Sequence, residues 1–144
     1  MGRLTIPRSG LVYGDTVTVI YAVEEHPVFW ATTVPIWEAA RRGDVEAVSS
    51  ELTLLEAMVG PEKSGSLEMA AAYETFFEGG VRLIPISKAI LRMAARLRAN
   101  LGLKTPDAIH AATALSASCA LFVTNDRQFR NVPGLNVALL ADAV

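Results

Sequence analysis

Short apolar runs alternate along this chain with longer segments in which apolar residues recur every three to four positions. The short runs predict buried strands, and the longer spacing predicts amphipathic helices. The expected strands are 11–13, 45–49, 81–86, 120–123 and 135–140. The expected helices are 16–24, 34–42, 53–59, 66–78, one between Ser87 and Gly102, and 105–115. Strands that alternate with helices favour a mainly parallel central sheet covered on both faces, which is a three-layer α/β/α fold.

Polar and conformationally special residues indicate where these helices begin and end. Asp15 and Thr33 are expected to cap the first two helices, and Gly43 to stop the second. The segment Thr53 to Glu56 matches a capping box, and residues 60–65 are expected to form a loop. Thr105 is expected to cap the last helix, with Pro106 at its first position and Asp107 in its first turn.

The composition indicates one globular domain. The chain has 144 residues, of which 51% are hydrophobic, enough for a substantial core. Residues 1–10 lack periodicity and are expected to form a loose leader before a domain at 11–144. No apolar run reaches the roughly 18 residues of a membrane span. The single Cys119 and the absence of a signal sequence favour a cytoplasmic protein.

The charge balance narrows the possible partners. Thirteen Lys and Arg residues face fifteen Asp and Glu residues, giving a net charge of −2. This balance argues against a generally basic surface for nucleic acid, although it leaves room for a local one. Basic or potentially basic residues near two of the acids are candidates for RNA contact: Lys104, His110 and Arg127.

Four acidic residues are the candidate chemistry. Asp15 and Asp126 follow predicted strands, Asp107 opens a helix, and Glu56 lies on the helix after the second strand. Helix capping alone explains an acid at each position. Together, however, they are expected at one edge of the sheet, where like charges need a cation. Oxygen ligands without a Cys or His cluster favour Mg²⁺ or Mn²⁺, and hence metal-assisted phosphodiester hydrolysis.

The motifs around these acids resemble those of a known family. The matching segments are Gly14-Asp15-Thr16, residues 50–56, Thr105 to Ala112 and Thr124 to Phe129. In order and spacing they resemble PIN-domain ribonucleases, particularly the VapC toxins of toxin-antitoxin pairs. The resemblance implies that the four acids, Asp15, Glu56, Asp107 and Asp126, bind metal and perform catalysis. It also implies that Thr124 supports them, with Thr16 and Asn125 as further supporting residues.

The same resemblance implies a compact parallel-sheet fold, homodimerisation, an RNA substrate and an antitoxin that blocks the site. One position departs from the family pattern, because Val17 stands where members usually carry Asn or Ser. Thr16 and Thr18 are the candidates to supply the missing hydrogen bond. Val17 therefore keeps open an alternative, a catalytically weakened PIN scaffold that dimerises or binds an antitoxin. A phosphatase of the aspartyl-phosphate type is disfavoured, because Val17 also replaces the second Asp of its motif.

Overall fold

A computed structural model describes residues 3–144, and Met1 and Gly2 of the predicted leader lie outside the described residues. The described strands are β1 (Leu11–Gly14), β2 (Glu46–Ser50), β3 (Arg82–Ile84), β4 (Leu121–Thr124) and β5 (Val137–Leu139). The described α-helices are α1 (Thr16–Val23), α2 (Trp30–Arg41), α3 (Glu51–Ser64), α4 (Leu67–Gly79), α5 (Lys88–Leu101) and α6 (Thr105–Ser116). Two short 3₁₀ helices follow β4 and β5, namely η1 (Arg127–Asn131) and η2 (Leu140–Ala143).

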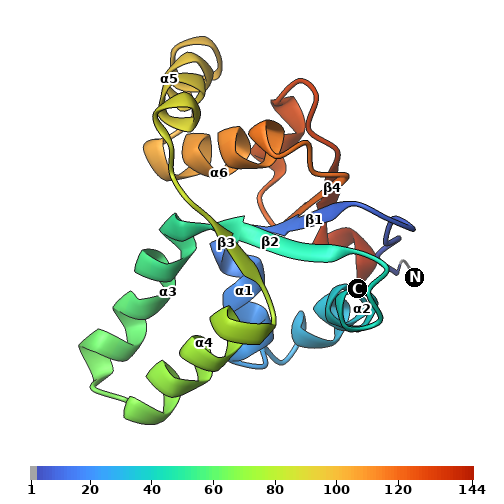
Figure 1. Ribbon diagram of the computed structural model, residues 1–144, viewed down its shortest axis with the longest axis vertical. Coiled ribbons are helices and arrows are strands. Elements are labelled where there is room, and N and C mark those ends of the chain that lie inside the picture. The colour runs from blue at the N-terminus through green and yellow to red at the C-terminus, as the bar shows by residue number, and fades with distance from the viewer. Residues whose placement is uncertain (1–2) are drawn as a thin grey trace.

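The five strands form one sheet in the order β3-β2-β1-β4-β5, and every neighbouring pair is parallel. Helices α5 and α6 cover one face, whereas α1 to α4 lie on the other side (Figure 1). The predicted three-layer α/β/α fold is therefore confirmed. From β1 the chain adds β2 and β3 on one side and β4 and β5 on the other, so the order reverses between β1 and β4. Ligands of open α/β sheets bind at such a reversal, beyond the carboxyl ends of the strands.

Alternating side chains of the central strands fill two cores, one on each face. Tyr13 and Phe122 pack under α5 and α6, with their rings stacked 5.0 Å apart. Val12 and Val123 point to the opposite face, where Ile36 of α2 packs. Burial of both faces explains why these strands appear in the sequence as continuous apolar runs. Leu4, within the predicted leader, is also buried in this second core.

Helix α2 begins earlier than predicted. It starts at Trp30 rather than at residue 34, and the expected cap Thr33 lies inside it. The Thr33 hydroxyl donates to the Trp30 carbonyl at 2.7 Å and accepts from the Trp37 indole at 3.0 Å. Thr33 is therefore a buried polar residue that links two turns of the helix, and not a cap.

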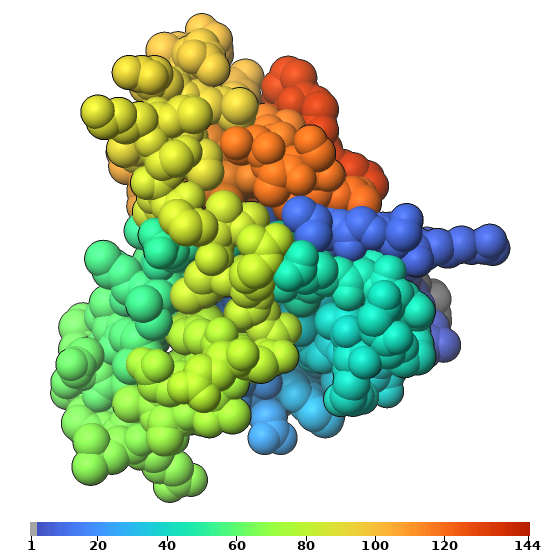
Figure 2. Space-filling view, in the orientation of Figure 1, coloured from blue at the N-terminus to red at the C-terminus, as the bar shows by residue number. Residues whose placement is uncertain are grey.

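Helix α3 is longer at both ends than predicted. Ser50 caps it by accepting from the backbone N–H of Leu52 at 3.0 Å, so the capping box at Thr53 was wrong. The expected loop at 60–65 was also wrong, because Gly60 and Pro61 continue the helix to Ser64. Gly65 ends it with a φ of 71°. In Figure 2 the pair α3 and α4 forms the end of the molecule opposite α5.

Helix α6 also begins differently from the prediction. Thr105 is its first residue and does not cap it, while Lys104 stands at the cap position without a side-chain hydrogen bond. The Thr105 hydroxyl instead accepts from Arg98 of α5 at 2.9 Å. Asp107 lies in the first turn, as predicted. No helix in residues 3–144 has the length and apolar character that a membrane crossing requires.

Candidate active site

A pocket of about 410 Å³ lies at the carboxyl edge of the sheet, where the strand order reverses. All four acids singled out by the sequence line it. Asp15 directly follows β1, Glu56 lies on α3, Asp107 opens α6, and Asp126 is two residues beyond β4. Thr16, Val17, His110 and Asn125 also contribute to its lining. The topology therefore brings together acids that are more than 100 residues apart in the chain.

Asp15 is the most enclosed of the four acids, with an exposed fraction of 7%. Its Oδ1 accepts from the Thr18 hydroxyl at 2.8 Å and from the Thr18 backbone N–H at 3.2 Å. Its Oδ2 accepts from the Thr124 hydroxyl at 2.6 Å. Burial raises the pKa of Asp15, although these hydrogen bonds act in the opposite direction. Thr124 thus contacts one of the four acids, and Thr18 supplies a hydrogen bond next to Val17.

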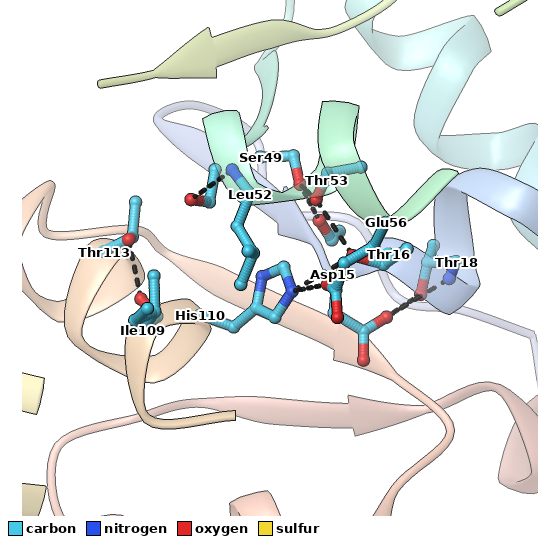
Figure 3. A network of polar contacts seen from close by, with 12 residues as sticks. Asp15, Thr16, Thr18, Ser49, Leu52, Thr53, Glu56, Ile109, His110 and Thr113 are labelled. Atoms are coloured by element: carbon cyan, nitrogen blue, oxygen red, sulfur yellow. Dashed lines mark hydrogen bonds and ion pairs between the residues drawn. The ribbon is translucent and has the colours of Figure 1, made fainter. Parts of the chain in front are cut away.

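Glu56 is held from two sides. Its Oε1 accepts from the Thr16 hydroxyl at 2.6 Å and lies 3.1 Å from the His110 Nε2 (Figure 3). The hydrogen bond with His110 lowers the pKa of Glu56. Thr53 lies 3.2 Å from Thr16 and 2.6 Å from Ser49, which places both members of the supposed capping box in this polar network. The sequence pattern therefore identified relevant residues but gave them the wrong local role.

His110 is enclosed in the protein, with only 3% of its surface exposed. Its Nδ1 lies 2.7 Å from the hydroxyl of the buried Tyr13. Because a carboxylate only accepts, the Nε2 next to Glu56 carries a hydrogen, and a neutral ring then accepts from Tyr13 at Nδ1. Both ring nitrogens therefore have protein partners, Tyr13 at Nδ1 and Glu56 with Thr16 at Nε2. Sequence reasoning missed Tyr13, since a tyrosine within an apolar strand gives no signal of such a contact.

Asp107 and Asp126 line the pocket and interact with each other. Burial and the negative charge of Asp126 raise the pKa of Asp107. The side-chain amide of Gln128 donates to Asp107 at 3.0 Å and to Asp126 at 2.7 Å. Asn125 accepts from the backbone N–H of Ala141 at 3.1 Å and thereby ties this loop to η2. Gln128 belongs to the last sequence motif, but an amide two positions after an acid did not by itself suggest a role.

The pocket offers oxygen ligands of the kind that Mg²⁺ and Mn²⁺ prefer. Within residues 3–144, no three His, Cys, Asp or Glu side chains come close enough together to hold a metal ion. Two of the predicted RNA-contacting residues are exposed: Lys104 at the cap position of α6, and Arg127 directly after Asp126. The third, His110, is buried.

The parallel sheet and its carboxylate-lined pocket define an α/β protein with an acidic site at a topological switch point. Residues 12–135 match the PIN domain family, and the chain belongs to that family. A comparison with curated protein sequences finds no match.

Solved structures with the same fold come from bacterial toxin-antitoxin complexes. One is VapBC2 from Rickettsia felis bound to a DNA fragment from its promoter, with 20% identity and a TM-score of 0.72 over 90% of this chain and 98% of the other. Another is DNA-bound VapBC from Salmonella typhimurium, with 22% identity and a TM-score of 0.68 over 90% and 97%. A toxin-antitoxin complex from Klebsiella pneumoniae has 23% identity and a TM-score of 0.66 over 90% and 97%.

Proposed function

We propose that this protein is a metal-dependent endoribonuclease that hydrolyses RNA phosphodiester bonds. The observation that carries the proposal is the joint lining of one pocket by Asp15, Glu56, Asp107 and Asp126 at the switch point of a PIN-domain sheet. Acids confined to one pocket repel each other, and a bound cation offsets that repulsion. A site of this kind suits a negatively charged substrate that binds through the same metal ion.

The four acids are the proposed ligands of Mg²⁺ or Mn²⁺. Such an ion supplies Lewis acidity and lowers the pKa of water to be used as a nucleophile. The chain's own contribution is to hold the ligands: Thr18 and Thr124 fix Asp15, and the pair Thr16 and His110 fixes Glu56. Glu56 stays ionised at neutral pH because its pKa is lowered, so it is available as a ligand or as a proton acceptor.

RNA is the proposed substrate, although the net charge of the chain is −2. The binding of a polyanion then depends on local cations near the pocket. Arg127 follows Asp126 directly, and Lys104 lies three residues before Asp107; both are exposed. These two side chains are the proposed contacts to the RNA backbone, which they would position without reading its sequence.

We further propose that the protein is the toxin of a type II toxin-antitoxin pair, acts in the cytoplasm and forms a homodimer. The fold shared with the VapBC structures of Rickettsia felis and Salmonella typhimurium supports this assignment.

The deciding experiment is cleavage of a panel of labelled tRNAs and rRNA fragments by purified, antitoxin-free protein. We expect cutting with Mg²⁺ or Mn²⁺, none with EDTA, and at least a hundredfold loss in Asp107→Asn, because an amide is a weaker metal ligand than a carboxylate. Asp44→Asn is the matched control. It makes the same chemical change at an exposed acid that pairs with Arg42 just before β2, at the opposite edge of the sheet.

Equal activity of Asp107→Asn and Asp44→Asn would contradict the proposed site. Absence of cleavage by folded wild-type protein on every RNA, together with absence of Mn²⁺ binding, would favour the alternative of a non-catalytic PIN scaffold. Val17 is the residue that keeps this alternative open, since it brings an apolar side chain to the lining of the pocket.

A further inference from the structure

Gln128 contacts two of the pocket acids at once. Its side-chain nitrogen lies 3.0 Å from Asp107 Oδ2 and 2.7 Å from Asp126 Oδ2. A carboxylate oxygen only accepts hydrogen bonds, and a primary amide has two N–H groups, so one donor is available for each acid. The amide therefore bridges α6 and the segment after β4.

The same residue holds Asp126 a second time. The backbone N–H of Gln128 donates to Asp126 Oδ1 at 3.0 Å, which caps η1. Both oxygens of Asp126 thus meet the same neighbour, and the carboxylate is fixed in orientation. The next residue, Phe129, is 1% exposed and packs on Phe122 at a ring distance of 4.7 Å. Gln128 is consequently anchored to the core beneath it.

The amide lies beside the pocket rather than in its lining. Asp107, Asp126 and Phe129 line the pocket, whereas Gln128 does not. The side chain therefore reaches the two acids from outside and leaves the pocket open. It is also neutral, so it offsets the repulsion between the two carboxylates without adding the positive charge by which a Lys or Arg would compete with a cation.

We propose that the side-chain amide of Gln128 is a neutral clamp that positions Asp107 and Asp126 side by side as ligands for a divalent cation. This inference rests on the proposed function, because it assigns Gln128 to the same metal-binding pocket. Groups that orient metal ligands through hydrogen bonds commonly contribute tenfold to a hundredfold to metal affinity. Gln128 is in this sense a positioning residue and does not itself hold the ion.

The test is calorimetric titration of metal-free, full-length protein with Mn²⁺ at a temperature well below its unfolding transition. Gln128→Met keeps the length of the side chain and removes both donors. We expect it to weaken Mn²⁺ binding by about tenfold or more. The matched control is Asn131→Leu, which replaces an exposed amide by an apolar side chain of similar shape at the far end of the same 3₁₀ helix. It is expected to leave the Mn²⁺ affinity unchanged.

The outcomes separate the clamp from other roles. Lower thermal stability of Gln128→Met with unchanged Mn²⁺ affinity would overturn the proposal, since the amide would then serve the fold alone. Tighter Mn²⁺ binding by the variant would also overturn it, because the amide would then compete with the ion. If neither wild type nor variants bind Mn²⁺ or cut RNA, the proposed function fails and the clamp with it. Metal-dependent cleavage by a wild type that binds Mn²⁺ no better than Gln128→Met would overturn the clamp alone.

Discussion

Asp15 owes its position to two threonines that lie far apart in the sequence. Thr18 is in the first turn of α1, and Thr124 ends β4 on the neighbouring strand. Each donates a hydroxyl to a different oxygen of the carboxylate. The Thr124 hydroxyl also accepts from the backbone N–H of Asp126 at 3.1 Å, so one side chain connects two acids of the site.

Thr124→Val is expected to destabilise the protein, because it removes a hydrogen bond to a buried, potentially charged group while preserving shape. Bonds of this type contribute about 1.5–3 kcal/mol. The free energy of unfolding from urea titration measures the effect. Thr113→Val is the control: Thr113 is equally buried, but its hydroxyl donates at 2.6 Å to the helix carbonyl of Ile109, a neutral acceptor. A loss at position 113 as large as that at position 124 would contradict the special role of Thr124.

At the scale of elements, the sequence predicts well wherever local chemistry decides. Ser87 caps α5 as expected, and Gly102 ends this helix with a φ of 72°. Predicted helix starts were wrong where contacts with distant parts of the chain outweigh the local capping preferences of the residues. Thr53 and Glu56 look like a capping box, but their side chains are drawn into contacts with Thr16 and His110, which no local pattern contains.

The sequence singled out the four acids and, through the family resemblance, three threonines that contact them, but it did not single out the other groups that contact them. Asp15, Asp107 and Asp126 could be selected because each stands near a strand end or a helix opening, and Glu56 because it was expected in the first turn of the helix after the second strand. Tyr13 and Gln128 could not, since their importance depends on which strand lies beside which helix. The order β3-β2-β1-β4-β5 supplies that information.

Two glycines of α3 provide a test of its corrected extent. Gly60 lies inside the helix with nothing outside α3 within 4 Å of an added Cβ, and Gly65 ends it with a positive φ. Gly65→Ala is expected to destabilise the protein by about 1–2 kcal/mol, because the left-handed conformation strains a residue that carries a Cβ. Gly60→Ala is expected to cost less, because Gly60 has a helical conformation and the gain in helix propensity offsets the contact of the new Cβ with the ring of Pro61. Both values come from urea unfolding. An equal or larger cost at Gly60 would contradict the end of α3 at Gly65.

At the scale of the whole molecule, the site makes stability depend on pH. Burial raises the pKa of Asp15 above the 3.8 of an unperturbed Asp. The folded state therefore binds the proton more tightly than the unfolded state, so this contribution to stability is complete below pH 3.8 and is lost as pH rises through the raised pKa. Glu56 acts oppositely: its contribution is present above its unperturbed value of 4.5 and is lost as pH falls through the lowered pKa.

Comparison of wild type with Asp15→Asn isolates the first contribution, because Glu56 is present in both proteins. We expect the free energy of unfolding of wild type to fall relative to the variant as pH rises from 4 towards 7 in EDTA. Saturating Mn²⁺ is expected to reduce or reverse that trend, since in the proposed metal site the ion binds the ionised form of the carboxylate. A difference between the two proteins that stays constant with pH would contradict the role assigned to burial of Asp15.

The pairing of β1 with β4 places Tyr13 beside Phe122. It also brings Asp15, after β1, to the same edge of the sheet as Asp126, after β4. During synthesis, Asp15 emerges early, but its partner Thr124 and the acid Asp126 are made only after more than 100 further residues. The segments made earlier include the residues of β1, β2 and β3 with Asp15 and Glu56, yet they lack Asp126 of the pocket. A ribosome-bound chain therefore lacks a complete site until β4 and the segment that follows it have been synthesised. Under the proposed function, RNA cleavage can therefore begin only after translation of the chain has passed residue 126.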